Sequence, residues 1–338
     1  MTCRTLWPPL QEGEGCDCSV CVSAEGHNSG AATIQQAIDS IKDHGGTVCL
    51  GIGEFRIAAP LTISGTRSLR IRGQGWATLL TGAAPGSLFD LSASTGVALE
   101  NLSALGSGGN SGTTAVIAAH NVVDLRIEHV NVLGVAVGDG TSVGIGLSGF
   151  ALATAIRDSR RRRRTRHRHA GARAAEPAVE RRAAHHRQHP AVRPARHQFD
   201  ATTLHYGTTR LDHNLMLLCT DASVVATGGV LPGSSVSVAD NVMYTMGDGV
   251  RAGIDGLALE RNEITGLGAR NRNGIVLQEG LDPVALDRVR IVANRLSLMR
   301  GNGIAIRHRV EDALIADNLI DATGQAGLLM EEGGAAAT

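Results

Sequence analysis

Short runs of alternating apolar and polar residues repeat along most of the chain, and an asparagine closes five of these runs. Each of the five has apolar or threonine side chains at its first and third positions, asparagine at its sixth and an apolar side chain at its eighth. The asparagines are Asn214, Asn241, Asn262, Asn294 and Asn318. Their spacings of 27, 21, 32 and 24 residues indicate a solenoid of stacked structural repeats.

Each run predicts a β-strand whose alternate side chains face the interior of the solenoid. The asparagine marks the turn that ends the strand, because asparagine tolerates left-handed backbone angles and its amide bonds main-chain groups left unpaired by a turn. In stacked coils we expect these amides to form a ladder. A second strand follows a glycine at 274–277, 303–306 and 327–330, and earlier coils place Leu102 and Val130 in the asparagine position.

An amphipathic helix is predicted over residues 33–42, before the first coil. Its apolar residues Ile34, Ala37, Ile38 and Ile41 share one helical face. The pair Gly45-Gly46 ends the helix, and a strand follows at 47–50. Such a helix closes the hydrophobic end that a solenoid otherwise leaves open.

This helix, the glycine turn and the first strand closely resemble the N-terminal entry of pectate-lyase-like right-handed parallel β-helix proteins. With the later coils the resemblance covers roughly residues 30 to 332, apart from 157–198. It implies an all-β fold, a right-handed parallel β-helix (β-solenoid) of about ten coils with an N-terminal amphipathic capping helix. The Asn-Thr-Asp, Asp-Asp, Gly-His-Gly and Arg-Ile-Lys elements of polygalacturonases do not occur, nor does the Asp-Pro-His-Glu element of mannuronan epimerases. No family mechanism is therefore carried over.

Residues 157–198 depart from the coil pattern and consist largely of arginine, alanine, histidine and proline. They divide the chain into a cysteine-bearing arm (1–29), the cap and first coils (30–156), the anomalous stretch, and the C-terminal coils (199–338). The stretch is a basic arm for nucleic acid or another polyanion, an inserted loop, or a set of coils translated out of frame. From Val130 to Asn214 is 84 residues, three steps of 28, with coil positions near 158 and 186. This spacing favours a frame slip, which would leave a gap about two coils tall.

The overall charge narrows the classes of partner. The 338 residues have a formal net charge of zero, so nothing global points to nucleic acid or an anionic membrane. No apolar run is long enough to span a membrane, and the first residues lack the apolar core of a signal peptide. We therefore expect no membrane partner, and a cytoplasmic location or leaderless export.

A cluster of soft ligands near the N-terminus is a candidate zinc site. Cys16, Cys18, Cys21 and His27 are of the types that zinc prefers. The alternative is a cap with free thiols, since structural zinc sites normally show two separated cysteine pairs. Cys49 and Cys219 are predicted to be small core residues.

Aligning the second strands on their glycines predicts a column of polar residues on one edge of the solenoid. Gln278, Arg307 and Glu331 take one position of this column, and Glu279 and His308 the next. As catalytic candidates, Arg307 would neutralise a substrate carboxylate while Glu279 or His308 handles a proton. Asp248, Arg251 and Asp255 extend the patch and, with Gln278 and Glu331, are candidate substrate-binding residues. The alternative is salt bridging between coils at a solvated edge.

Three functional hypotheses follow. The first is a protein that interacts with polysaccharide, with a lyase, epimerase or hydrolase of uronate-rich glycans as its enzymatic form, because long stacked faces offer grooves for extended chains. The second is a non-catalytic structural or adhesive module of a spike or particle, associating through an uncapped C-terminal coil. The third is polyanion binding through the basic stretch, although that stretch lacks the aromatic side chains that stack on single-stranded nucleic acid.

Overall fold

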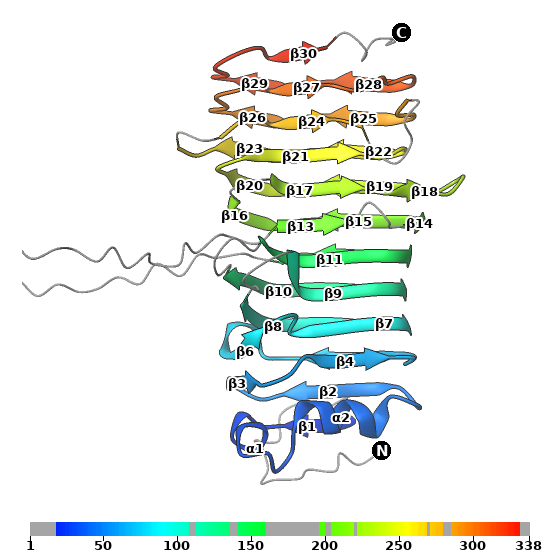
Figure 1. Cartoon of the computed structure of the whole chain (residues 1–338), viewed down its shortest axis with the longest axis vertical. Helices are drawn as coiled ribbons and strands as arrows, with labels where there is room; N and C mark the ends of the chain where they lie inside the picture. Colours follow the sequence, from blue (N-terminus) through cyan, green and yellow to red (C-terminus); the bar gives the residue numbers. More distant parts are fainter. Residues whose placement is uncertain are drawn as a thin grey trace, which may run out of the picture.

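The computed structural model describes residues 18–107, 113–135, 141–159, 196–199, 204–219, 222–268, 271–279 and 285–331. These residues form a parallel β-helix of about nine turns, in agreement with the fold predicted from the sequence. Successive coils lie one above another, from α1, α2 and β1 at one end to β30 at the other (Figure 1). Within the described ranges, no helix has the length and apolar character needed to cross a membrane.

Two sheets run along most of the stack, a third of five strands covers the coils from β16 to β29, and the strands of all three pair in parallel. The first contains β1 (Val20–Val22), β2 (Gly46–Leu50), β5 (Leu69–Arg72), β8 (Ala98–Ser107), β10 (Arg126–Val135), β12 (Ala155–Arg157), β15 (Thr208–Asp212), β19 (Ser235–Ala239), β22 (Leu257–Glu260), β25 (Val289–Val292) and β28 (Ala313–Ala316), with β3 (Gly53–Ile57) and β6 (Thr78–Pro85) beside this path.

The second sheet contains β4 (Leu61–Ser64), β7 (Phe89–Thr95), β9 (Thr113–Val123), β11 (Thr141–Leu152), β13 (Arg196–Phe199), β17 (Ala222–Thr227), β21 (Asp248–Gly253), β24 (Ile275–Leu277), β27 (Ile304–Ile306) and β30 (Leu328–Met330), with β14 (Leu204–Tyr206) and β18 (Gly229–Val230) beside it. The third contains β16 (Leu215–Cys219), β20 (Val242–Thr245), β23 (Glu263–Gly266), β26 (Arg295–Ser297) and β29 (Leu319–Asp321). The helices are α1 (Ala24–Asn28), α2 (Ile34–Ile41) and the 3-10 turn η1 (Gly75–Ala77).

The core is a set of apolar columns, because parallel pairing in register places equivalent side chains directly above one another. One column consists of buried residues from seven successive coils: Leu99, Ile127, Ile156, Leu211, Val238, Leu259 and Ile291. These are the third positions of the alternating runs, so the apolar periodicity predicted the interior correctly. Aromatic residues fill the wider N-terminal coils, where Phe55 and Phe89 are the largest fully buried side chains.

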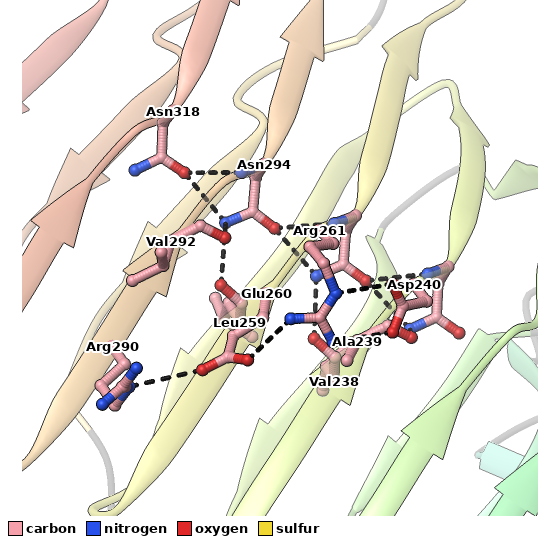
Figure 2. A network of polar contacts seen from close by, with 12 residues as sticks. Val238, Ala239, Asp240, Leu259, Glu260, Arg261, Arg290, Val292, Asn294 and Asn318 are labelled. Atoms are coloured by element: carbon pink, nitrogen blue, oxygen red, sulfur yellow. Dashed lines mark hydrogen bonds and ion pairs between the residues drawn. The ribbon is translucent and has the colours of Figure 1, made fainter.

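The predicted asparagine ladder is present. The side-chain oxygen of Asn262 accepts hydrogen bonds from the main-chain N–H (3.2 Å) and the amide of Asn241 (3.0 Å). The Asn262 amide in turn donates to Asn294 Oδ1 at 2.9 Å and to the Val238 carbonyl at 2.8 Å. Figure 2 shows the same pattern continuing to Asn318. At the other end of the ladder, Asn214 Oδ1 accepts the main-chain N–H of Ser159.

The prediction that the asparagines themselves adopt left-handed backbone angles is wrong by one residue. It is the residue before each asparagine that has a positive φ, as in Asp240 (55°), Arg261 (52°) and Ala293 (56°). The strained backbone therefore lies on the outer surface, and the asparagine itself points inward to bond the neighbouring coils. Because only the asparagine bonds the neighbouring coils, it recurs, while the outer residue before it varies.

The N-terminal cap forms as predicted, but its cysteines do not pair as expected. Helix α2 buries Ile34, Ala37, Ile38 and Ile41 and begins with a capping box between Thr33 and Gln36. Cys49, predicted to be a core residue, instead forms a disulfide with Cys18. The disulfide ties the segment before β1 to the first full coil.

The stack continues directly across the anomalous stretch. Ile156 of β12 pairs with Leu211 of β15, so these two coils are neighbours. The coil position expected near 158 is filled by Ser159, which bonds Asn214. The position expected near 186 and the gap of about two coils are not found, because β12 and β15 leave no room between them. Residues 160–195 lie outside the described residues, and the frame-slip interpretation stays a prediction.

Candidate functional site

A cavity of about 560 Å³ lies on the outer face of the second sheet, where β21, β24 and β27 stack. Its lining comes from four successive coils: Asp248 and Arg251; Asn271, Arg272, Asn273, Val276 and Gln278; Arg300, Gly301 and Arg307; and Gln325. Four of the eight catalytic and substrate-binding candidates predicted from the sequence line this cavity, namely Asp248, Arg251, Gln278 and Arg307.

The floor of the cavity follows from the alternation along the strands. Ile275 and Leu277 face the interior, so Val276 between them faces outward. Val276 is nevertheless only 1% exposed, because polar side chains from the flanking segments rise around it. The neighbouring outward residue of β27, Ala305, is fully buried for the same reason. The site is therefore recessed and has a small apolar base.

Arginine dominates the charge of the cavity. Four guanidinium groups line it, from Arg251, Arg272, Arg300 and Arg307, against the single carboxylate of Asp248. Within the described ranges, the exposed side chains of Arg272 and Arg300 have no ion-pair partner. Arg251 and Arg307 are paired with Asp248 and Glu331, so it is Arg272 and Arg300 that favour an anion. Arginine binds carboxylate in a planar, bidentate geometry.

The segments that hold Arg272 and Arg300 are fixed by a second set of amide bonds. Asn271 Oδ1 accepts the main-chain N–H of Arg300 at 2.9 Å, and its amide donates to the Leu298 carbonyl at 2.7 Å. Asn273 Oδ1 accepts both the main-chain N–H (2.9 Å) and the amide (3.0 Å) of Asn302. These bonds tie the backbone at Leu298, Arg300 and Asn302 to the coil that holds Asn271 and Asn273.

The predicted polar column exists in register. Leu277, Ile306 and Met330 pair across β24, β27 and β30, so the residues that follow them, Gln278, Arg307 and Glu331, stand in line. Arg307 Nε lies 3.2 Å from Glu331 Oε1, and both side chains are nearly half exposed. The alternative of salt bridging between coils is therefore realised within the column, at the same time as Arg307 lines the cavity.

The remaining candidates lie outside the cavity lining. Glu279 is exposed and His308 is half-buried, at the next position of the column. Asp255 accepts the main-chain N–H of Asp287 at 2.9 Å, which is a turn-stabilising role. The catalytic assignment of Glu279, Arg307 and His308 stays a prediction.

Reasoning from the sequence missed Arg272, Arg300, Asn271, Asn273 and Gln325. A weak signal was present, because Asn-Gly precedes two of the second strands, at Asn273-Gly274 and Asn302-Gly303. That repeat marked a second amide ladder, and the arginines stand one or two residues before it.

The zinc site predicted near the N-terminus stays a prediction, because Cys16 lies outside the described residues. Cys18 is in the disulfide with Cys49, and Cys21 lies opposite Cys49 in the backbone register of β1 and β2. His27 Nδ1 accepts the main-chain N–H of Ile34, so Nε2 carries the proton and donates to the Arg56 carbonyl. Burial lowers the pKa of His27 although this second bond opposes the shift. Among the described residues, no group of three His, Cys, Asp or Glu side chains could hold a metal ion.

Comparison with known proteins adds likenesses of shape only. No protein-family model matches the chain, and no curated protein matches its sequence. Similar solved structures include ORF18 of Geobacillus virus E2, with 11% identity and a TM-score of 0.43 over 92% of this chain and 60% of that chain. The A-module of mannuronan C-5 epimerase AlgE4 of Azotobacter vinelandii has 15% identity and a TM-score of 0.42 over 90% of this chain and 94% of that chain.

The catalytic domain of a GH87 alpha-1,3-glucanase in complex with nigerose has 11% identity and a TM-score of 0.41 over 95% of this chain and 67% of that chain. The chain spans less than two thirds of the length of ORF18 of Geobacillus virus E2. Because these identities and TM-scores are low, the fold assignment rests on the strand pairing described above.

Proposed function

We propose that the chain binds an acidic polysaccharide in the arginine-lined cavity over β21, β24 and β27. The observation that carries this proposal is the charge of the lining, four guanidinium groups against one carboxylate. Arg272 and Arg300 are the primary contacts, because both are exposed and without an ion-pair partner among the described residues. The ligand class is a glycan with carboxylate groups, which match the planar fork of arginine.

The shape of the site supports an extended ligand over a compact one. The lining residues come from four successive coils, and coils stack about 4.8 Å apart. The site therefore reaches about 14 Å along the stack, which suits several linked sugars.

Binding to defined oligosaccharides tests the proposal. Calorimetric titration with an oligouronate should give a measurable dissociation constant, and a neutral oligosaccharide of equal length should bind much more weakly. The double variant Arg272→Glu/Arg300→Glu should lose about tenfold or more in affinity, because two attractions become repulsions.

The matched control is Arg67→Glu/Arg295→Glu. Both are exposed arginines outside the cavity with no ion-pair partner among the described residues, and the net charge changes equally. Equal losses in the two double variants would refute a specific site at the cavity. Polyanion binding through the basic stretch, most of which lies outside the described residues, would give that result.

The enzymatic form of the proposal is a lyase, epimerase or hydrolase of uronate-rich glycan. It is tested by following unsaturated products and reducing ends during incubation with uronate polymers. Glu279→Gln and His308→Asn should abolish turnover while leaving binding intact, because neither residue lines the cavity. Turnover that is unchanged in both variants would remove these two residues from the reaction.

A second candidate function is a structural module that associates through its last coils. Large apolar side chains there are exposed, including Leu314 (47%), Leu319 (57%) and Leu328 (47%). Light scattering should then show an oligomer that Leu319→Lys dissociates. A monomer at all concentrations would exclude this candidate.

A further inference from the structure

One rung of the second amide ladder is an aspartate. Main-chain hydrogen bonds join Gly249 to Asn273 and Gly274 to Asn302, so Asp248, Asn273 and Asn302 occupy equivalent positions in three successive coils. Asn273 Oδ1 accepts from Asn302, and Asn302 Oδ1 in turn accepts the main-chain N–H of Ala326, so each rung accepts from the next coil. Asp248 stands at the start of this ladder, where the pattern of the later coils calls for asparagine.

The two oxygens of Asp248 have different tasks. Oδ1 accepts the main-chain N–H of Asn273 at 3.0 Å and the Asn273 amide at 3.1 Å, as an asparagine oxygen would. Oδ2 accepts from Arg251, at 2.7 Å from Nη2 and 3.3 Å from Nε. An asparagine in this place would keep the first pair of bonds but turn an N–H group toward Arg251. An asparagine could therefore make the hydrogen bonds of the ladder, whereas the contacts with Arg251 require a carboxylate.

Burial distinguishes this ion pair from the others among the described residues. The side chain of Asp248 is 4% exposed and that of Arg251 is 19% exposed, whereas Arg307 and Glu331 are each more than 40% exposed. A charge removed from water needs a partner with good geometry. The pair therefore fixes the guanidinium of Arg251 in the wall of the cavity, and the ladder fixes Asp248.

We infer that Asp248 is a positioning residue that holds Arg251 ready for the carboxylate of the ligand. This inference rests on the proposed function, since it concerns the same cavity. A side chain already ordered before binding loses less freedom when the ligand arrives, so it contributes more to affinity. In this proposal Asp248, which the sequence predicts to contact the substrate, acts through Arg251.

The variant Asp248→Asn separates this role from simple charge. It keeps the oxygen that accepts from Asn273 and removes one negative charge from the cavity. If only net charge governed binding, an acidic oligosaccharide would bind Asp248→Asn more tightly than wild type. If Asp248 positions Arg251, the variant binds about tenfold more weakly, the loss of a charge-assisted contact.

The experiment is a double-mutant cycle with Asp248→Asn, Arg251→Gln and the double variant, titrated with the same oligouronate. We expect each single variant to weaken binding about tenfold, and the double variant to bind no more weakly than Arg251→Gln alone. Unchanged or tighter binding by Asp248→Asn would overturn the inference, and so would additive losses in the double variant.

A readout without ligand keeps the inference separable from the proposed function. Phenylglyoxal modification of Arg251, followed by mass spectrometry, should be slow in wild type and faster in Asp248→Asn. Arg295, exposed and outside the cavity, should react equally in both. Equal reactivity of Arg251 in the two proteins would overturn the positioning role even if wild type binds the oligouronate. Failure of wild type to bind, with Arg251 still protected by Asp248, would overturn the proposed function alone.

Discussion

Replacing Asn262 by alanine tests how much the asparagine ladder contributes to stability. Asn262 is an interior rung, 1% exposed. The substitution removes four side-chain hydrogen bonds: two accepted from Asn241, one donated to Asn294 and one donated to the Val238 carbonyl. The Asn241 amide keeps two carbonyl partners, and Asn294 Oδ1 keeps the main-chain N–H of residue 262. The main-chain N–H of Asn241 loses its side-chain acceptor.

The expected loss follows from this count. A buried N–H without a partner costs about 1–3 kcal/mol, and each of the other three bonds contributes about 1 kcal/mol. Asn262→Ala should therefore lower the free energy of unfolding by about 4–6 kcal/mol. The terminal rung Asn318 is half-buried and makes three side-chain bonds, so Asn318→Ala should cost about 2 kcal/mol.

Urea unfolding followed by circular dichroism measures both values. Asn262→Leu is the control for volume, because Leu102 and Val130 fill the equivalent position in earlier coils and are fully buried. It should destabilise as much as the alanine variant, since leucine also leaves Asn241 without its acceptor. A cost below about 1 kcal/mol for Asn262→Ala, or full recovery by leucine, would show that the ladder is a packing feature and not a hydrogen-bond network.

Three further predictions concern other parts of the molecule. Burial lowers the pKa of His205 to about 4 from 6.5, so the unfolded chain binds the proton at a higher pH than the folded chain does. The free energy of unfolding should therefore fall by about 3 kcal/mol as the pH drops from 6.5 to about 4. In His205→Gln this pH dependence should vanish from urea unfolding curves. The Cys18–Cys49 disulfide closes a loop with a separation of 31 residues, and Cys49→Ser should lower the free energy of unfolding by about 3 kcal/mol, a value that reduction of wild type should reproduce. The Arg261 guanidinium holds the pKa of Asp240 below its usual range through a side-chain hydrogen bond. Because this pair is exposed, Arg261→Ala should lower the free energy of unfolding by less than about 1 kcal/mol at neutral pH. This difference from wild type should disappear as the pH falls through the lowered pKa of Asp240.

The periodic features of the fold were predictable from the sequence, because each depends on contacts between equivalent positions. Leu211 and Val238 repeat with the asparagines, and in-register stacking follows from that repetition alone. The left-handed residue was misplaced because the positive φ belongs to positions such as Asp240 and Arg261, whose side chains vary. The Cys18–Cys49 disulfide could not be derived, since the pairing of cysteines depends on how the first strand lies against the second.

The candidate site likewise contains some residues that could be predicted from the sequence and others that could not. Gln278 and Arg307 belong to strands with a fixed distance from a glycine, so their alignment was visible. Arg272 and Arg300 precede their glycines by different distances, and only the path of the connecting segments brings them to one cavity. The ion pair of Asp248 with Arg251 could not be predicted, because an aspartate in a polar patch gives no sign of its burial.

The direct stacking of β12 on β15 makes the chain modular at that point. Ser159 leaves the solenoid while bonded to Asn214, and β13 resumes the second sheet in register with β11 and β17. The pairings described on both sides all come from residues outside 160–195. A short linker or a cargo domain exchanged for 160–195 would therefore leave every one of these pairing residues in the chain.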